Sequence, residues 1–507
     1  MNPESISPET PEYTPNPGLE SSAGTTKTEA PTSRKRLSPL VLMVVILIIL
    51  AVITAVLYIF IGPKRYKGVV DPTALTSKCV GANTITWWLP DTPQTQAANY
   101  TSMIAAYNKL RDKNSQITVD IVNRKYDEYN YYSNLLAAMA KNAGPDIMAL
   151  RNDDLSSYRE YILPFATVDT KKLELYKKAF VDIVGQDTIF NDKLYGIATY
   201  VDNLQLYYNK ELLDQNSVPR PASSWSDIQK QSRTLSKSKE KGFSLSTISL
   251  GIGSTPTSNS NIIENQDIVP MIISQYGGTI YDTKTNQIGF QINDKTRQAF
   301  IDGVNFYLSF SSNTSTNYSW DEYMGQNVDE FLQGRLVYMV GYKELDQTLK
   351  LRRPDLDYQV TSLPQFNPLA KKTFGKYFVN TMSRALGTAD QTNANIGVKR
   401  ACTEDFLTYM ATPEAQKLYT AASQMPSASR EVLNDQLNIS GDQKTRTFAE
   451  GVLIATSYYK PDVVNAEKIW GQMITDARGQ KDVTNAVSAA VDKYNELITQ
   501  GPVIRQR

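Results

Sequence analysis

An uninterrupted apolar segment near the N-terminus constrains this chain more than any other feature. Residues 40–61 contain no charged side chain, and at about 1.5 Å per residue a helix of this length crosses a hydrocarbon core of about 30 Å. Basic clusters flank the segment, at 34–36 before it and 64–67 after it, which is atypical of a buried core helix. A cleaved signal peptide would have a shorter apolar region closer to the N-terminus. We therefore predict a transmembrane helix over 37–62.

The segment before this helix is predicted to be a disordered cytoplasmic tail over 1–36. It is rich in Pro, Ser and Thr, and its only aromatic residue is Tyr13, so it cannot bury enough apolar surface to offset the entropy lost on ordering. The basic cluster at 34–36 favours retention of this tail in the cytoplasm. The basic residues after the helix weaken this prediction, because they make the positive charge on the two sides of the helix nearly equal. Residues 63–82 are predicted to be a linker to a large soluble region.

Composition excludes several classes of function. The chain has 53 Lys and Arg against 52 Asp and Glu, a formal net charge of +1, which argues against electrostatic binding to nucleic acid. It contains no histidine, so Ser-His-Asp triads, Cys-His pairs and histidine metal sites are absent. We expect no catalytic residue, no metal site and no cofactor. Cys79 and Cys402 would form either one disulfide outside the membrane or two buried thiols.

The first part of the soluble region alternates strand and helix patterns. Residues 84–89 and 117–122 alternate as strands do, and 147–150 form a third short apolar run. Between them, apolar side chains recur at helical spacing, at Met103, Ile104, Tyr107 and Leu110 and then at Tyr132, Leu135, Leu136 and Met139. This order predicts an α/β fold with a mainly parallel sheet covered by helices, and the length of the region predicts two lobes.

Polar loops follow the first and third predicted strands, at 90–93 and 151–154. In parallel sheets, ligands bind beyond the carboxyl ends of the strands because loops and helix N-termini converge there. We therefore expect Asp91 and Asp153 near a ligand, although acidic loop residues commonly cap helices or form turns.

Later segments extend the same pattern. Strands are predicted at 194–197 and 204–208, and helices at 262–276 and 296–310. The sequence Thr412-Pro413-Glu414 is typical of a helix start.

Several segments together resemble the bacterial extracellular solute-binding proteins of family 1, the maltose-binding-protein-like receptors of sugar ABC importers. The resemblance covers about 84–500 and depends on the order and spacing of motifs that are individually weak. These are Thr84-Ile-Thr-Trp-Trp, Gly144-Pro-Asp-Ile, Lys193-Leu-Tyr-Gly-Ile, Val201-Asp-Asn-Leu-Gln-Leu-Tyr-Tyr-Asn-Lys, Trp225, Phe331-Leu-Gln-Gly-Arg, Leu363-Pro and Thr412-Pro-Glu.

The resemblance implies a two-lobed periplasmic-binding-protein-like fold that closes on a ligand. One lobe would comprise 83–200 and 378–425, and the other 201–377 and 426–507. The chain would cross between them near 200–203, 377–381 and 425–427. Both cysteines would belong to the first lobe. Most relatives carry a lipid-bearing cysteine, whereas here the predicted helix serves as the anchor.

The resemblance also implies a sugar site, in which aromatic faces pack against the ring and polar groups bind the hydroxyls. Asp202 matches a carboxylate position of maltose-binding relatives, the alternative being a hinge residue that bonds only the backbone. Tyr342 and Tyr459, with its neighbour Tyr458, fall where relatives carry cleft aromatics. Trp88 ends the first strand and is either a stacking platform or ordinary core.

The predicted function is that of a membrane-anchored extracellular receptor that captures a sugar or oligosaccharide and delivers it to the permease subunits of an ABC importer. It would perform no chemistry. A surface glycoside hydrolase is the alternative from the enzyme class, although no carboxylate pair in the sequence has the supporting context. A ligand-sensing subunit of a membrane signalling system shares the fold and differs only in partner.

Overall fold

The computed structural model describes Cys79 and residues 83–125, 128–141, 143–254, 260–387, 394–439, 441–479 and 482–500. All of them belong to one of the two units into which the chain divides, 65–507. The predicted tail (1–36), the predicted membrane helix (37–62) and the predicted linker (63–82) apart from Cys79 lie outside the described residues. Within the described part of the chain, no helix combines the length and apolarity that a membrane span needs.

The first lobe is built on a six-stranded sheet in the order β2-β1-β3-β17-β4, with β7 also paired to β17. Strand β1 pairs in parallel with both β2 and β3, as the strand and helix pattern predicted. In β1, Ile85, Trp87 and Leu89 are buried while the residues between them are more exposed. The strands are β1 (Thr84–Pro90), β2 (Thr118–Arg124), β3 (Ile147–Arg151), β4 (Ile162–Leu163), β7 (Gly196–Ala198) and β17 (Phe378–Ser383).

The prediction of mainly parallel sheets is wrong, because both large sheets are mixed. Strand β17 runs antiparallel to β3, β4 and β7. Its first residue, Phe378, pairs with Arg151 at the end of β3. The chain therefore enters this sheet from the side of the other lobe, at the edge where β3 ends, and must run in the opposite direction.

The second lobe contains a five-stranded sheet in the order β10-β11-β14-β9-β15. Strands β11 and β14 are parallel, whereas β9 is antiparallel to both β14 and β15. Every residue of β9 and of β14 is buried, and β14 is apolar along its length, as is typical of a strand that is covered on both faces. The strands are β9 (Gln205–Asn209), β10 (Lys237–Ser238), β11 (Phe243–Ile248), β14 (Leu336–Gly341) and β15 (Tyr358–Thr361).

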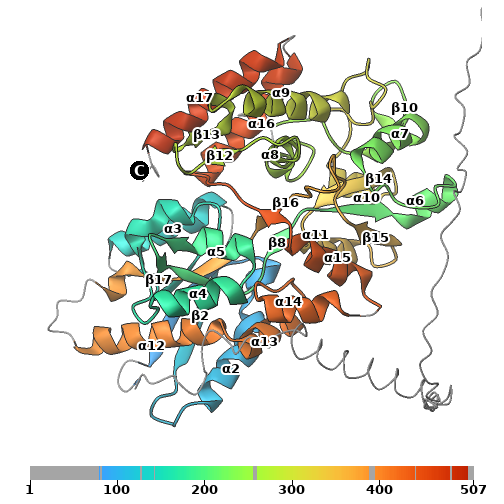
Figure 1. Cartoon of the computed structure of the whole chain (residues 1–507). Helices are drawn as coiled ribbons and strands as arrows, with labels where there is room; N and C mark the ends of the chain where they lie inside the picture. Colours follow the sequence, from blue (N-terminus) through green and yellow to red (C-terminus); the bar gives the residue numbers. More distant parts are fainter. Residues whose placement is uncertain are drawn as a thin grey trace, which may run out of the picture. The chain divides into compact units, whose positions relative to one another are not determined.

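A small three-stranded sheet lies where the chain passes between the lobes. Strand β16 (Thr373–Lys376) pairs antiparallel with β8 (Asp202–Asn203) and parallel with β18 (Ala455–Thr456), and Figure 1 shows β8 and β16 side by side at this junction. The chain passes from one hydrophobic core to the other between Val201 and Leu204, and again between Phe374 and Tyr377. Leu433 packs in the core of the first lobe, and α15 gives Ala449 and Val452 to that core but Phe448 to the core of the second lobe. The chain therefore passes between the two cores a third time along α15.

Helices cover both sheets. In the first lobe α12 contacts β1, β7 and β17, and it packs with α2 and α13. Helix α13 begins as predicted, with the Thr412 side chain accepting a hydrogen bond from the backbone of Ala415 and Pro413 at the first position. The helices of this lobe are α2 (Thr101–Lys109), α3 (Glu128–Ala140), α4 (Thr170–Ala179), α5 (Asp182–Thr188), α12 (Ala394–Met410), α13 (Pro413–Ser423) and α14 (Arg430–Leu437).

In the second lobe, α16 and α17 pack against each other and against α9, and α16 also packs against α8. Helices α8 and α9 confirm the two predicted there, with Asn293 capping α9 through the backbone of Thr296. The helices are α6 (Lys210–Gln215), α7 (Trp225–Leu235), α8 (Asn265–Gln275), α9 (Asp294–Ser309), α10 (Asn327–Leu332), α11 (Glu344–Arg352), α15 (Gln443–Val452), α16 (Val463–Gly479) and α17 (Val483–Gln500).

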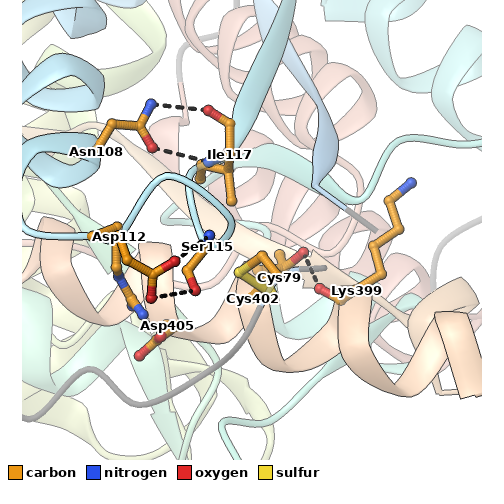
Figure 2. Close-up of a disulfide and its surroundings, with 10 residues drawn as sticks. Cys79, Asn108, Asp112, Ser115, Ile117, Lys399, Cys402 and Asp405 are labelled. Atoms are coloured by element: carbon orange, nitrogen blue, oxygen red, sulfur yellow. Dashed lines mark hydrogen bonds and ion pairs between the residues drawn. A yellow bond between two sulfur atoms is a disulfide. The ribbon is translucent and has the colours of Figure 1, made fainter. Parts of the chain in front are cut away.

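A disulfide joins Cys79 to Cys402 in α12, with a Cα–Cα distance of 5.8 Å. This decides between the two states that the sequence left open. Figure 2 shows the bridge beside the loop after α2, where the Asp112 carboxylate accepts hydrogen bonds from Ser115 and the Asn108 side chain bonds the backbone of Ile117. The segment preceding β1 is thereby attached to a helix that covers the first sheet.

Candidate functional site

The carboxyl end of β3 supplies the first part of a polar site at the junction of the lobes. The guanidinium of Arg151 donates to both carboxylate oxygens of Asp153, with Nε at 3.0 Å and Nη2 at 2.6 Å. Both side chains are more than nine-tenths buried. A pair of parallel N–H···O bonds fixes the orientation of the carboxylate as well as its charge.

Lys460 approaches Asp153 from the second lobe. Its ammonium lies 3.2 Å from Asp153, 2.8 Å from Asp267 and 2.9 Å from Glu467, and its side chain is 1% exposed. The backbone N–H of Lys460 also donates to the carbonyl of Asp153 at 2.7 Å. Arg151 reaches across the same junction to Glu467 at 3.0 Å. We call these five residues, Arg151, Asp153, Asp267, Lys460 and Glu467, the junction network.

The charges of the junction network hold one another ionised against the cost of burial. Burial lowers the pKa of Lys460, but Asp267 and Glu467 outweigh it, so that the pKa lies well above its ordinary value. Burial likewise opposes ionisation of Asp267 and Asp153, but the cations, Lys460 for Asp267 and Arg151 for Asp153, hold both pKa values below the ordinary one. The network is therefore a set of fixed charges with defined orientations at neutral pH.

A second charged group lies next to it. The ammonium of Lys376 is 3.0 Å from Glu264 and 3.8 Å from Glu344, and it lies 4.1 Å from the centroid of the Tyr342 ring. Gln94, from the first lobe, donates to Glu344 at 2.7 Å. Burial raises the pKa of Glu264 to about 7 despite Lys376.

Tyr342 connects the two groups. Its hydroxyl donates to Asp267 at 3.0 Å, and its ring faces Lys376. It is 2% exposed, so the hydroxyl and one ring face are both occupied by protein groups in this structure. Tyr459 is half-buried nearby, with its hydroxyl 3.0 Å from Ser157 of the first lobe and its ring 5.3 Å from that of Tyr281.

Asp202 lies at the junction but is directed at backbone. Its carboxylate accepts hydrogen bonds from the N–H groups of Asn203 at 2.7 Å, Lys343 at 2.7 Å and Glu344 at 3.1 Å. Burial, with Glu344 nearby, raises its pKa to about 7. The residue serves the free N–H groups at the start of α11, as a capping side chain does. This geometry favours the alternative of a hinge residue that bonds only the backbone.

Trp88 and Asp91 make their contacts away from this network. Trp88 is half-buried, with the Arg124 guanidinium 4.1 Å from its ring centroid, whereas its neighbour Trp87 is core. Asp91 is exposed and accepts a hydrogen bond from Gln96 at 2.6 Å. The loops after β1 and β3 both reach charged side chains of the second lobe, the first through Gln94 and the third through Arg151 and Asp153, but Trp88 and Asp91 take no part in these contacts.

Four residues of the junction network were not singled out from the sequence. Arg151 begins a loop that was selected, and Lys460 directly follows the selected Tyr458 and Tyr459, so proximity in sequence was the available signal. Asp267 and Glu467 lie inside α8 and α16, where acidic residues are ordinary and no spacing rule marks them. Among the described residues no group of three or more potential metal ligands is arranged to hold an ion.

A family model described as bacterial extracellular solute-binding protein matches residues 102–444, which is more than half of the chain. The chain belongs to this family. Its members are described as extracellular solute-binding proteins.

Individual relatives of this solute-binding protein are distant. The galactooligosaccharide-binding protein of Bacillus subtilis (strain 168) is 23% identical over 177 residues, covering 35% of this chain and 37% of that protein. The match thus spans little more than a third of the curated relative.

Three solved structures illustrate the shared fold. The cyclic alpha-maltosyl-1,6-maltose binding protein of Arthrobacter globiformis matches with a TM-score of 0.64 at 15% identity, over 83% of this chain and 100% of that one. UgpB of Mycobacterium tuberculosis, solved with glycerophosphocholine, gives 0.63 at 15%, over 83% and 99%. The sugar-binding protein MalE of Xanthomonas citri gives 0.61 at 16%, over 82% and 98%. These likenesses establish the two-lobed fold alone.

Proposed function

We propose that this chain is a membrane-tethered extracellular receptor that binds a sugar or oligosaccharide between its lobes and delivers it to an ABC importer. The observation that carries the proposal is the junction itself, where oriented carboxylates, a bidentate guanidinium and two tyrosines of the second lobe meet beside the strands that link the lobes. Groups of this kind bind sugar hydroxyls and the apolar faces of sugar rings.

The proposed ligand contacts are those expected from the sequence, with unequal structural support. Asp153, Tyr342 and Tyr459 lie at the junction and make contacts across it or within its network. Asp202 lies there too, but its oxygens face backbone. Trp88 and Asp91 belong to the neighbouring loop, and they would meet a ligand only at the margin of the site. To this set we add Arg151 and Lys460, whose groups would exchange bonds with ligand hydroxyls.

The names of relatives support a carbohydrate as the ligand class. The curated relative binds galactooligosaccharide, and structural neighbours were solved with tagatose, cycloalternan and maltotetraose. One neighbour was solved with glycerophosphocholine, so a polar phosphodiester is the competing ligand class in any screen.

Tethering and delivery are the finer parts of the proposal. The apolar segment at 40–61 supports a single membrane helix with the tail in the cytoplasm, and family membership supports an extracellular position for the large domain. A tether keeps the receptor at a high local concentration near its permease. Lobe closure on a ligand would allow the permease to distinguish loaded from empty receptor.

A binding screen on the full-length protein in detergent micelles tests the ligand class. Maltotetraose, a galactooligosaccharide, tagatose and glycerophosphocholine are compared by thermal shift, followed by calorimetry and by analysis of the sugar after incubation. Saturable stoichiometric binding of an unaltered oligosaccharide supports the receptor. Release of shorter sugars would support the glycoside hydrolase instead. Preferential binding of glycerophosphocholine would show that the ligand is a polar phosphodiester and not a carbohydrate.

Two further experiments address the membrane and the partner. Protease added to intact cells should degrade the region after Lys67 and spare the tail before Arg34, whereas protection of the large domain would reverse the proposed orientation. Affinity purification from the native membrane should recover ABC permease subunits. Recovery of a signalling kinase in their place would assign the chain to ligand sensing.

A further inference from the structure

A polar cavity lies on the second lobe, outside the junction. Its volume is about 690 Å³, which falls in the range of about 300 to 1,000 Å³ typical of small-molecule sites. The end of α9, the loop that follows it and the last turn of α16 form its walls. The family resemblance and the junction network assign no role to it.

Uncharged hydrogen-bonding groups dominate the lining of this cavity. Hydroxyl and amide side chains come from Asn305, Ser309, Ser312, Asn313 and Ser315. The charged groups present are already engaged with protein partners: Glu322 pairs with Arg478, and Asp321 accepts hydrogen bonds from the Tyr318 hydroxyl at 2.9 Å and the Tyr323 backbone at 3.0 Å. A neutral ligand with many hydroxyl groups therefore matches the cavity better than an ion does.

Two tyrosines add aromatic surface to the same cavity. Tyr323 is 61% exposed, although large aromatic side chains are usually buried. Tyr318 is held in place because its ring packs 4.8 Å from that of Phe243 and its hydroxyl is bonded to Asp321. Exposed tyrosine beside hydroxyl and amide groups is the combination that recognises a sugar ring, since the ring has an apolar face and a polar rim.

A buried acceptor next to the cavity lacks a partner. Asn317 is 7% exposed, and its Oδ1 has no hydrogen-bond partner among the residues that the structure describes. Its Nδ2 donates to Ser309 at 3.0 Å, and its backbone N–H donates to Ser315 at 3.1 Å. Both serines line the cavity. Through these two bonds Asn317 holds the Ser309 and Ser315 hydroxyl groups in place at the wall of the cavity.

The cavity is separate from the junction along α16. Glu467 of the junction network lies near the start of this helix, and Arg478 of the cavity lies near its end. Eleven residues at about 1.5 Å each place them roughly 16 Å apart along the axis. Occupation of one site therefore does not require the other, and the inference does not depend on the proposed function.

We propose that this cavity is a second binding site, which takes a segment of a neutral oligosaccharide with one sugar ring on Tyr323. Outside a cell such a site would hold a longer glycan against the second lobe without entering the junction.

The test uses the full-length protein in detergent micelles. Binding of two probes, maltotetraose and a galactooligosaccharide, is measured by saturation-transfer NMR. The variant Tyr323→Ala removes the ring, and Tyr323→Phe keeps the ring while removing the hydroxyl. Leu351→Ala is the matched control, because Leu351 is another exposed apolar side chain, 81% exposed, on α11. A glucuronic acid oligomer serves as the charged comparison.

The expected result is a component of sugar binding that weakens about fivefold or more in Tyr323→Ala, equivalent to about 1 kcal/mol. The same component should persist in Tyr323→Phe and Leu351→Ala, and should be weaker for the charged oligomer. If the proposed function is wrong, the sugar binding that all three variants share will be absent. If this inference is wrong, Tyr323→Ala will bind sugar as the parent protein does. Equal binding by all variants, preference for the charged oligomer, or no binding of either neutral probe at millimolar concentration overturns the second site.

Discussion

The ammonium of Lys460 lies 3.2 Å from the carboxylate of Asp153, and this contact joins side chains from two different lobes. The backbone N–H of Lys460 bonds the Asp153 carbonyl as well, and Ser157 bonds the Pro461 carbonyl at 2.9 Å beside them. The segment around Lys460 thus occupies the junction with hydrogen bonds and ion pairs between protein groups. A ligand that binds there must replace some of these contacts.

Replacing Lys460 with Met should destabilise the protein by about 3 to 5 kcal/mol, because three buried carboxylates then lose their shared cation. Urea denaturation measures the loss, and small-angle scattering should show that the lobes of the remaining folded protein are further apart. Lys444→Met is the control for removal of a lysine charge, since Lys444 is half-buried and pairs with Asp346 within the second lobe. Equal effects of the two substitutions would show that Lys460 does not hold the lobes together.

The disulfide predicts a clear thiol count. Cys79 and Cys402 are the only cysteines, so labelling of the unfolded, unreduced protein should detect no free thiol. Replacing Cys402 with Ser should lower the free energy of unfolding by about 2 to 5 kcal/mol, because the bridge restricts a very long loop in the unfolded chain. Reduction of the parent should reproduce the loss and leave the variant unchanged. Two reactive thiols in the unreduced parent would contradict the bridge.

Much of this fold could be predicted from the spacing of apolar residues, because that spacing is a local property of each strand and helix. The strands β1, β2 and β3 and the helices between them carry their own apolar patterns, and Thr412 and Pro413 mark a helix start by their chemistry alone. The direction of β17 was not accessible, because it depends on where the chain returns from the other lobe. The position of the third crossing could not be predicted either. There α15 gives Ala449 and Val452 to the core of the first lobe and Phe448 to the core of the second.

The candidate site was only half predictable for a related reason. Sheet topology nominated the loop that contains Asp153, because the ends of strands can be read from sequence, and in the structure this loop meets Lys460 of the other lobe. Its partners Asp267, Lys460 and Glu467 approach from distant helices and loops, and neither composition nor spacing distinguishes them from surface charges. Asp202 was selected by family position, which identifies the place in the fold but not the direction of the carboxylate.

Stability should be greatest at mildly acidic pH. The carboxylate of Asp187, a half-buried residue, accepts hydrogen bonds from Asn152 at 2.9 Å, Tyr377 at 2.8 Å and Ser457 at 2.5 Å. Burial raises its pKa to about 7, with nearby Asp153 acting in the same direction. A raised pKa contributes stability that is fully present below about pH 4 and is lost as the pH rises through 7. Asp202 and Glu264, with pKa values also raised by burial to about 7, act likewise.

The acidic limit comes from the junction network. The lowered pKa values of Asp153 and Asp267 contribute stability above about pH 4 that is lost as the pH falls. Denaturation between pH 3 and 8 should therefore give a maximum near pH 4 to 5, and Asp187→Asn should flatten the alkaline side by up to about 4 kcal/mol, at about 1.4 kcal/mol per pKa unit. A parent protein whose stability rises steadily to pH 8 would contradict these assignments.

Asp202 gives the sharpest test between a ligand contact and a structural group. Its oxygens serve three backbone N–H groups, two of them at the start of α11, and the side chain is 2% exposed. Asp202→Ala should lower the stability of the unliganded protein by about 1 to 3 kcal/mol, since buried donors lose their acceptor. Asp202→Asn keeps one acceptor oxygen and should retain part of the stability that Asp202→Ala loses. Urea denaturation without ligand, together with sugar affinity measured on the folded fraction, separates the two roles. If Asp202→Ala leaves unliganded stability intact but weakens sugar binding about tenfold, then the carboxylate turns to the ligand in solution and the family position is functional after all.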